Sequence, residues 1–100
     1  KYVSKLWLIF SQDLSRKMLQ SIISGMSDSV PNVRINAAKA GLSAIVNPKC
    51  SYAVNLSLTS EIKEMIKAGL QKQTADSDGG VATNAKECIK AMALGVALPL

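Results

Sequence analysis

The fold of this chain is decided by the stretch Asp28-Ser29-Val30-Pro31-Asn32-Val33-Arg34-Ile35-Asn36-Ala37-Ala38-Lys39-Ala40. We interpret it as a turn that leads into a helix. Asp28 and Ser29 can accept hydrogen bonds from the free N–H groups at a helix start, and Pro31 is tolerated in a first turn. Arg34 and Lys39 are expected off the packed face of this helix. That face is predicted from small and apolar residues at three- and four-residue steps: Val33, Ala37, Ala40 or Gly41, and Ala44.

A second, weaker copy of the pattern occupies residues 76–86. Matching residues lie at a constant spacing of 48 positions: Asp28 and Asp76, Val33 and Val81, Asn36 and Asn84, and Ala37 and Ala85. This arrangement of an aspartate, a valine, a basic residue and alanines is similar to the turn and second helix of a HEAT repeat. The spacing is slightly longer than the roughly 40–47 residues of HEAT and armadillo repeats, which indicates a lengthened linker between the copies.

The chain is therefore expected to be all-α, a HEAT-repeat solenoid segment (an α-α superhelix) with about two repeats and a preceding helix. We predict a helix of the preceding repeat at residues 1–10, a first helix pair at 13–46, a linker loop at 47–59 and a second helix pair at 60–98. Within the linker, apolar residues alternate as they do in a short strand. No second strand is predicted to pair with it, so a packed loop and a functional insertion both remain open.

Each predicted helix carries an apolar stripe at helical spacing. Helix starts are expected at Ser11, Ser60 and Asp78, and an outer pair between Glu64 and Lys67. The residues predicted to face inward are Val3, Leu6, Trp7 and Phe10; Leu14, Met18, Leu19, Ile22, Ile23 and Met26; Ile62, Met65, Ile66, Gly69 and Leu70; and Val81, Ala85, Cys88, Ile89, Met92 and Val96.

The composition argues against chemistry at an active site. The chain has no histidine, and its two cysteines, Cys50 and Cys88, are far apart in sequence. Metal sites and mechanisms that depend on histidine are therefore not expected, and we predict free, reduced thiols rather than a disulfide. Nor does a phosphate-binding loop occur, because Gly79 and Gly80 lack the lysine and the further glycine of that motif. We expect no enzyme activity and no cofactor.

The net charge of +5 lies in the first half of the chain. It permits an acidic partner or nucleic acid there, but no run of three basic residues occurs and no aromatic side chains are interleaved to stack on bases. Nucleic acid is therefore not the expected ligand. Residues 91–100, the longest uncharged apolar tract, fall short of the roughly 20 residues of a membrane span. We expect a cytoplasmic or nuclear protein, and the apolar tail is either covered by more protein or self-associates.

Binding is the remaining function, and a solenoid binds through surfaces made by repetition. The two predicted turns lie on one edge and expose the candidate partner-binding residues Ser29, Val30, Pro31, Asn32, Ser77 and Asp78. Val30 is the informative member, because a branched apolar residue at the tip of a turn is costly to leave in water. It either packs on its own turn or contacts a partner.

Four stretches together resemble the carboxy-terminal repeats of the scaffold (A) subunit of protein phosphatase type 2A: Phe10-Ser11-Gln12-Asp13-Leu14 through Met18-Leu19, Asp28 through Lys39, Ser60-Glu61-Ile62-Lys63, and Asp76-Ser77-Asp78. In that family, the last of fifteen HEAT repeats hold the serine/threonine phosphatase catalytic subunit by their intra-repeat turns. The resemblance implies a scaffold whose catalytic-subunit contacts come from the six turn residues.

The chain also departs from that family. Ala82 stands where the pattern has a basic residue, and Gly79-Gly80 replaces bulkier positions. Another HEAT adaptor, such as a transport receptor of the importin type, therefore remains an alternative. Because the chain starts at Lys1 without an initiator methionine, we interpret it as part of a longer protein, whose other repeats would carry further regulatory subunits.

Overall fold

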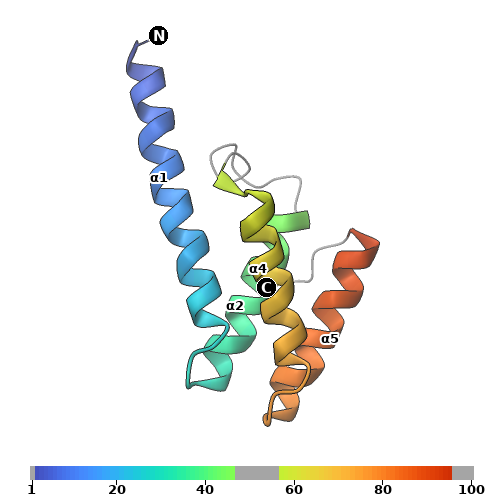
Figure 1. The fold of residues 1–100 in the computed structure, drawn as a ribbon. Helices are drawn as coiled ribbons and strands as arrows, with labels where there is room; N and C mark the ends of the chain where they lie inside the picture. Colours follow the sequence, from blue (N-terminus) through green and yellow to red (C-terminus); the bar gives the residue numbers. More distant parts are fainter. Residues whose placement is uncertain (1, 47–56, 96–100) are drawn as a thin grey trace.

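Four helices form two antiparallel hairpins in this computed structural model, which describes residues 2–46 and 57–95 (Figure 1). Helices α1 (Tyr2–Gly25) and α2 (Pro31–Val46) make the first hairpin, and α4 (Ser60–Gln73) and α5 (Gly79–Leu94) make the second. The described ranges contain no strand, so the all-α prediction is confirmed. None of these helices combines the length and the apolar composition that a membrane span requires.

Helix α1 is longer than predicted. The sequence suggested a break near Ser11, but one helix runs from Tyr2 to Gly25 without interruption. No proline or glycine occurs between these two ends, so nothing prevents the helix from continuing. Asp13, which was expected near a helix start, instead pairs with Lys17 one turn later at 3.5 Å. The predicted inward stripe of Val3, Leu6, Trp7 and Phe10 lies outside the side chains that the structure describes.

Helix α2 begins at Pro31, as its sequence predicted. The preceding turn is closed by Asp28, whose Oδ1 accepts a hydrogen bond from the Val30 N–H at 2.9 Å. Of the predicted packed face, Ala37, Gly41 and Ala44 are buried, whereas Val33 is exposed. Ala38 and Leu42, which were not predicted, are buried as well. The small side chains let a second helix approach closely, and a Cβ on Gly41 would lie only 3.0 Å from Cγ2 of Ile66 in α4.

The second hairpin starts and ends at residues with clear local roles. Thr59, rather than Ser60, caps α4 by accepting a hydrogen bond from the Ile62 N–H at 3.2 Å. Asp78 caps α5 as predicted and accepts from the Val81 N–H at 3.1 Å. Helix α5 ends at Leu94, earlier than predicted, because Gly95 adopts a left-handed φ of 70° that terminates it. Val96 lies outside the described residues.

The hydrophobic core lies between the hairpins. Helix α2 contacts both α4 and α5, while α1 contacts α2 and α4. Residues of both hairpins meet there: Met26, Ala37, Ala38 and Leu42 from the first, and Ile66, Leu70, Cys88 and Ala91 from the second. Cys88 is a buried free thiol, as predicted, whereas Cys50 lies outside the described residues. The hairpins are thus packed on each other, not joined only by the chain.

Several residues predicted to face inward are exposed. The exposed fractions are 51% for Leu14, 47% for Met18, 39% for Val33 and 47% for Met65. These apolar residues recur at helical spacing, but no described element covers them. Arg34 shows the opposite error: it was expected off the packed face, yet its side chain is only 15% exposed.

Only the end of the predicted linker can be compared with the structure. Residues 47–56 lie outside the described ranges. Ser57 is buried and its hydroxyl donates to the backbone carbonyl of Gln12 in α1 at 2.9 Å. The end of the linker is therefore anchored to the first hairpin.

The turns of the two hairpins lie at the same end of the molecule (Figure 1). One turn joins α1 to α2 and the other joins α4 to α5. The sequence-based expectation that both turns share one edge is confirmed by this arrangement.

Candidate functional site

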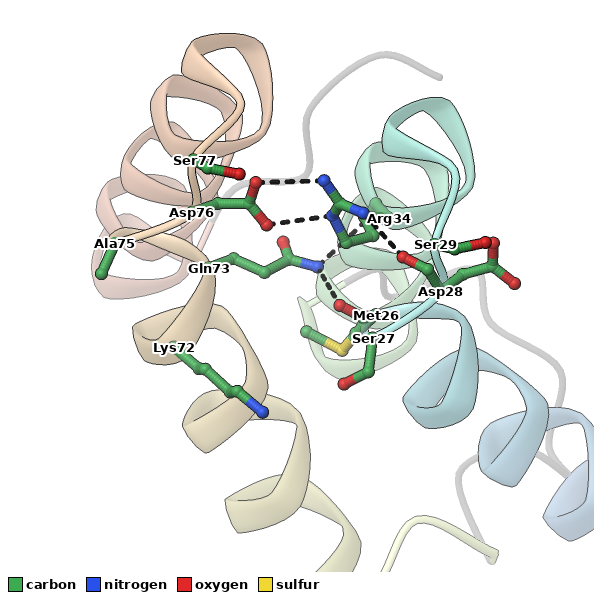
Figure 2. A pocket seen from close by; sticks show the side chains of 10 residues that line it. All are labelled: Met26, Ser27, Asp28, Ser29, Arg34, Lys72, Gln73, Ala75, Asp76 and Ser77. Atoms are coloured by element: carbon green, nitrogen blue, oxygen red, sulfur yellow. Dashed lines mark hydrogen bonds and ion pairs between the residues drawn. The ribbon is translucent and has the colours of Figure 1, made fainter.

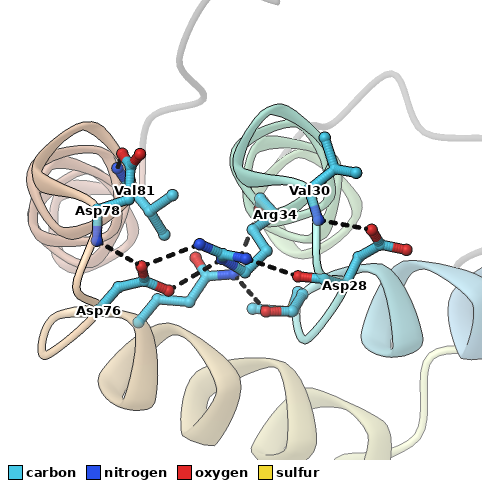
Figure 3. A network of polar contacts seen from close by, with 8 residues as sticks. Asp28, Val30, Arg34, Asp76, Asp78 and Val81 are labelled. Carbon is cyan, nitrogen blue, oxygen red and sulfur yellow. Dashed lines mark hydrogen bonds and ion pairs between the residues drawn. The ribbon is translucent and has the colours of Figure 1, made fainter.

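Arg34 connects the two turns through its guanidinium group (Figure 3). Its Nε lies 2.9 Å from Oδ2 of Asp76, and its Nη2 donates to Oδ1 of the same carboxylate at 3.1 Å. The third nitrogen, Nη1, donates to the backbone carbonyl of Asp28 at 2.7 Å. A two-pronged ion pair of this kind restricts both the distance and the orientation of the groups it joins. Arg34 therefore sets the position of the second turn relative to the first.

Asp76 is held in the charged form. The backbone N–H of Asp78 donates to its Oδ1 at 2.8 Å. This hydrogen bond, followed by the hydrogen bond and charge of Arg34, lowers the pKa of Asp76 below its ordinary value of 3.8, against the opposing effect of desolvation. Since each interaction favours the carboxylate over the acid, the ion pair persists at neutral pH.

Gln73, the last residue of α4, makes a second link between the hairpins. Its Nε2 donates to the backbone carbonyl of Met26 at 2.8 Å and to that of Arg34 at 3.3 Å. The side chain is only 3% exposed, and its Oε1 has no hydrogen-bond partner among the described residues. Gln73 thus donates hydrogen bonds to two backbone carbonyl groups of the first hairpin, those of Met26 and Arg34, at a place that is shielded from water.

An open groove of about 520 Å³ separates the two turns (Figure 2). Ser29 of the first turn and Ser77 of the second both line it, with Arg34, Gln73 and Asp76 between them. Its full lining is Met26, Ser27, Asp28, Ser29, Arg34, Lys72, Gln73, Ala75, Asp76 and Ser77. We call this the turn groove. Its lining combines hydroxyl and charged groups with the apolar side chains of Met26 and Ala75.

The structure brings the six predicted partner-binding residues to one edge but exposes them unequally. We call this set, Ser29, Val30, Pro31, Asn32, Ser77 and Asp78, the turn ridge. Ser29, Val30, Asn32 and Ser77 are exposed, whereas Pro31 and Asp78 are half-buried. Val30 is 49% exposed at the tip of its turn. One carboxylate oxygen of Asp78 is used for its helix cap, which leaves it less available to a partner.

Sequence reasoning missed the two residues that join the turns, Arg34 and Gln73. A usable signal existed for Arg34. Asp28 and Asp76 recur in the same register, so a basic residue just after the first turn could have been paired with the acidic residue of the second. No comparable signal existed for Gln73, because its role depends on where the Met26 carbonyl lies in space.

The described residues carry neither a metal-binding cluster nor an exposed thiol. In residues 2–46 and 57–95, no group of three or more His, Cys, Asp or Glu side chains is placed to hold a metal ion. Cys88 is buried, and desolvation raises the pKa of its thiol. A buried thiol with a raised pKa is a poor nucleophile at neutral pH. The exposed groups at the turn ridge are hydroxyls, an amide and the Val30 side chain.

Comparison of the chain with protein-family models, with curated proteins and with solved structures yields no match.

Proposed function

We propose that this chain is a non-catalytic scaffold segment of the HEAT-repeat type, which docks a serine/threonine protein phosphatase catalytic subunit through its turn ridge. The chain would act by holding its two turns at a fixed spacing. Each turn contributes a small contact, and the partner recognises the turns together because their spacing is constant. The sequence resemblance suggests the partner, and the geometry of the turns supports the mode of binding.

The observation that carries the proposal is the side-by-side position of two turns whose spacing is restricted by side chains. Arg34 and Gln73 both cross from one hairpin to the other at this edge. A surface that is already ordered loses less conformational entropy on binding than flexible loops do. Val30 then presents an exposed apolar group at the end of the first turn, directly before α2.

The basic first half of the chain favours a second candidate, a helical module that binds nucleic acid or an acidic partner. Two of its cations are already paired with carboxylates: Lys17 with Asp13 and Arg34 with Asp76. Each pairing reduces the charge available to phosphate groups. Titration with single-stranded and duplex oligonucleotides at two salt concentrations separates the candidates, because phosphate binding weakens steeply as salt rises.

Substitution of Val30 by glutamate tests the phosphatase proposal. We expect V30E to weaken binding of the catalytic subunit by about fivefold or more, because a charge would replace an apolar contact at the interface. Met65→Glu is the matched control, since Met65 is 47% exposed but lies in the middle of α4. The measurement is the dissociation constant for the purified catalytic subunit, with circular dichroism to confirm folding. Equal affinity of folded V30E and the parent would refute the assignment of this site.

A further inference from the structure

One side of the second hairpin carries lysines at positions whose counterparts in the first hairpin are buried. In the first hairpin these positions are occupied by uncharged residues: Ser15, Leu19, Ala38 and Leu42. The residues 48 positions later are all exposed lysines: Lys63, Lys67, Lys86 and Lys90. We call these four lysines the lysine face. Four buried, uncharged positions of the first hairpin therefore correspond to four exposed cations of the second.

The lysine face borders an open groove between α4 and α5. Each helix contributes two lysines that are four residues apart and so lie on one stripe of that helix. The groove, of about 330 Å³, is lined by Lys67, Leu70, Gln71, Ile89, Met92 and Ala93. Lys90 follows Ile89 directly, and Lys86 precedes it by less than one turn. An apolar groove is thus flanked by cations on both helices.

The equivalent side of the first hairpin is covered by the second hairpin. Ala38 and Leu42 share a core with Leu70 of α4, and Leu19 packs against Ile62 of the same helix. An apolar cover of this kind does not suit the lysine face, because burial of an unpaired ammonium group is costly. A partner that covers the lysine face must therefore supply negative charge.

Most of the positive charge of the lysine face is not neutralised within the chain. Lys67 lies 3.6 Å from Glu64, but both side chains are well exposed. Across residues 2–46 and 57–95, the other three lysines of the face make no ion pair. Like charges one helical turn apart also repel each other slightly. Carboxylates from a partner would relieve this repulsion.

We propose that the lysine face binds an acidic segment of a partner protein that also carries an apolar side chain. The carboxylates of the segment would pair with the lysines, and its apolar side chain would enter the groove against Leu70, Ile89 and Met92. The lysine face shares no residue with the turn ridge, and the proposal does not depend on phosphatase binding.

An acidic peptide fits this surface better than nucleic acid does. None of the four cations is an arginine, whose planar group matches phosphate geometry best. No aromatic side chain lines the groove to stack on a base. A phosphate backbone would use the charges and leave the apolar groove empty, whereas an apolar residue flanked by carboxylates uses both features.

Fluorescence anisotropy measures the binding directly. The probe is a short fluorescein-labelled peptide in which leucines are flanked by glutamates, and the protein is the complete chain at constant, low ionic strength. We expect saturable binding to the parent. Two control peptides, one with glutamine for each glutamate and one with alanine for each leucine, should bind at least about fivefold more weakly, because each lacks one recognised feature.

A charge-removing variant locates the contact on α5. Lys86→Gln combined with Lys90→Gln should weaken binding of the glutamate–leucine peptide by about fivefold or more. Lys17→Gln combined with Lys72→Gln is the matched control, since it removes the same number of exposed charges outside the lysine face. This control should bind the peptide clearly more tightly than K86Q/K90Q does.

A second variant tests the groove itself. Ala93 is exposed and lines the groove, so Ala93→Glu places a carboxylate where the acidic segment would lie and should also weaken binding. Gln20→Glu adds the same charge at an exposed position of α1 and should leave the affinity near that of the parent. Circular dichroism confirms that each variant is folded. If K86Q/K90Q does not fold, the comparison of A93E with Q20E decides the question.

Several results would overturn the proposal. The first is the absence of saturable binding to the parent, and the second is equal affinity of folded K86Q/K90Q and K17Q/K72Q. Equal affinity for the alanine peptide, or tighter lysine-dependent binding of a single-stranded oligonucleotide, would show that the face attracts polyanions in general. The phosphatase catalytic subunit should bind K86Q/K90Q as tightly as it binds the parent; a loss would assign the lysine face to the phosphatase interface instead.

Discussion

Nε of Arg34 lies 2.9 Å from Oδ2 of Asp76, a residue 42 positions later in the chain. The two side chains are only 15% and 14% exposed, so water and salt screen the pair less than they screen a surface pair. Arg34 also donates to the backbone carbonyl of Asp28 in its own turn. Arg34 therefore links the turns of the two hairpins directly, in addition to the contact made by Gln73.

The shape of the guanidinium, and not its charge alone, should matter for stability. We expect Arg34→Ala to lower the melting temperature by about 5–10 °C. Arg34→Lys should recover only part of this loss, because an ammonium group cannot make the two-pronged contact. Lys17→Ala is the control, since its pair with Asp13 is well exposed and should contribute little. Thermal unfolding by circular dichroism measures all three; full stability in R34K would contradict the geometric role.

The stabilising effect of Asp76 should depend on pH in a defined direction. The pKa of Asp76 in the folded state lies below its ordinary value of 3.8, chiefly because of the Asp78 N–H and then Arg34. Its contribution is therefore complete above the unfolded pKa and is lost as the pH falls through the folded pKa. We expect the stability difference between the parent and Asp76→Asn to be constant at neutral pH and to be lost on acidification, as the pH falls below 3.8 and through the lowered folded-state pKa. Denaturant titrations at several pH values measure it, and a difference that grows on acidification would refute this assignment.

Replacement of Gln73 should destabilise the chain by leaving the backbone carbonyl of Met26 without its hydrogen-bond donor. Gln73→Leu removes the donor to the backbone oxygens of Met26 and Arg34, and the expected cost is about 1–3 kcal/mol. Gln71→Leu is a control of the same chemistry two residues earlier, where the side chain is exposed. Urea unfolding gives both free energies. Equal values for the two variants would show that the hydrogen bonds of Gln73 contribute nothing.

Ala37 should not tolerate a larger side chain. Ala37 is only 8% exposed. A Cβ placed on Gly25 of α1 would lie 3.0 Å from the Cβ of Ala37, so α1 and α2 are already close at this point. Ala37→Leu is expected to cost roughly 1–3 kcal/mol through overpacking. Ala68→Leu, at an exposed position of α4, controls for the change in composition. A melting temperature of A37L equal to that of the parent would contradict the packing of α1 against α2.

The two possible roles of Asp78, helix capping and partner binding, can be separated by two substitutions. Asp78→Ala removes the acceptor for the Val81 N–H and should cost about 1 kcal/mol of stability. Asp78→Asn keeps a capping oxygen while removing the charge, so its stability should stay close to that of the parent. Thermal unfolding measures the first role and phosphatase affinity the second. Reduced affinity in a fully stable D78N would assign a contact to the charge.

Local features of the chain were the easiest to predict. Pro31 at the start of α2 and Asp78 as the cap of α5 were both expected from sequence and are confirmed. The end of α5 was not predicted correctly, although Gly95 is a residue type that often terminates helices. The predicted break near Ser11 was wrong because a possible capping residue does not stop a helix when the following residues continue it.

The direction in which apolar stripes face was harder to predict. Leu14 and Leu19 both belong to the apolar side of α1, yet Leu14 is 51% exposed and Leu19 is fully buried. Helical periodicity identifies an apolar face, but it does not say which part of that face a neighbouring helix will cover. The turn residues were placed on one edge correctly, whereas the cross-hairpin contacts of Arg34 and Gln73 were not foreseen.

The sequence alone determined the helical class, the turn into α2 and the 48-residue register, because these depend on propensities and spacings among neighbouring residues. Tertiary structure alone decided that Arg34 reaches Asp76, that Gln73 reaches the Met26 carbonyl, and that Leu14, Met18 and Val33 remain uncovered. The physical reason is that each of these outcomes depends on where residues far apart in the chain come to lie in space once the hairpins are packed together.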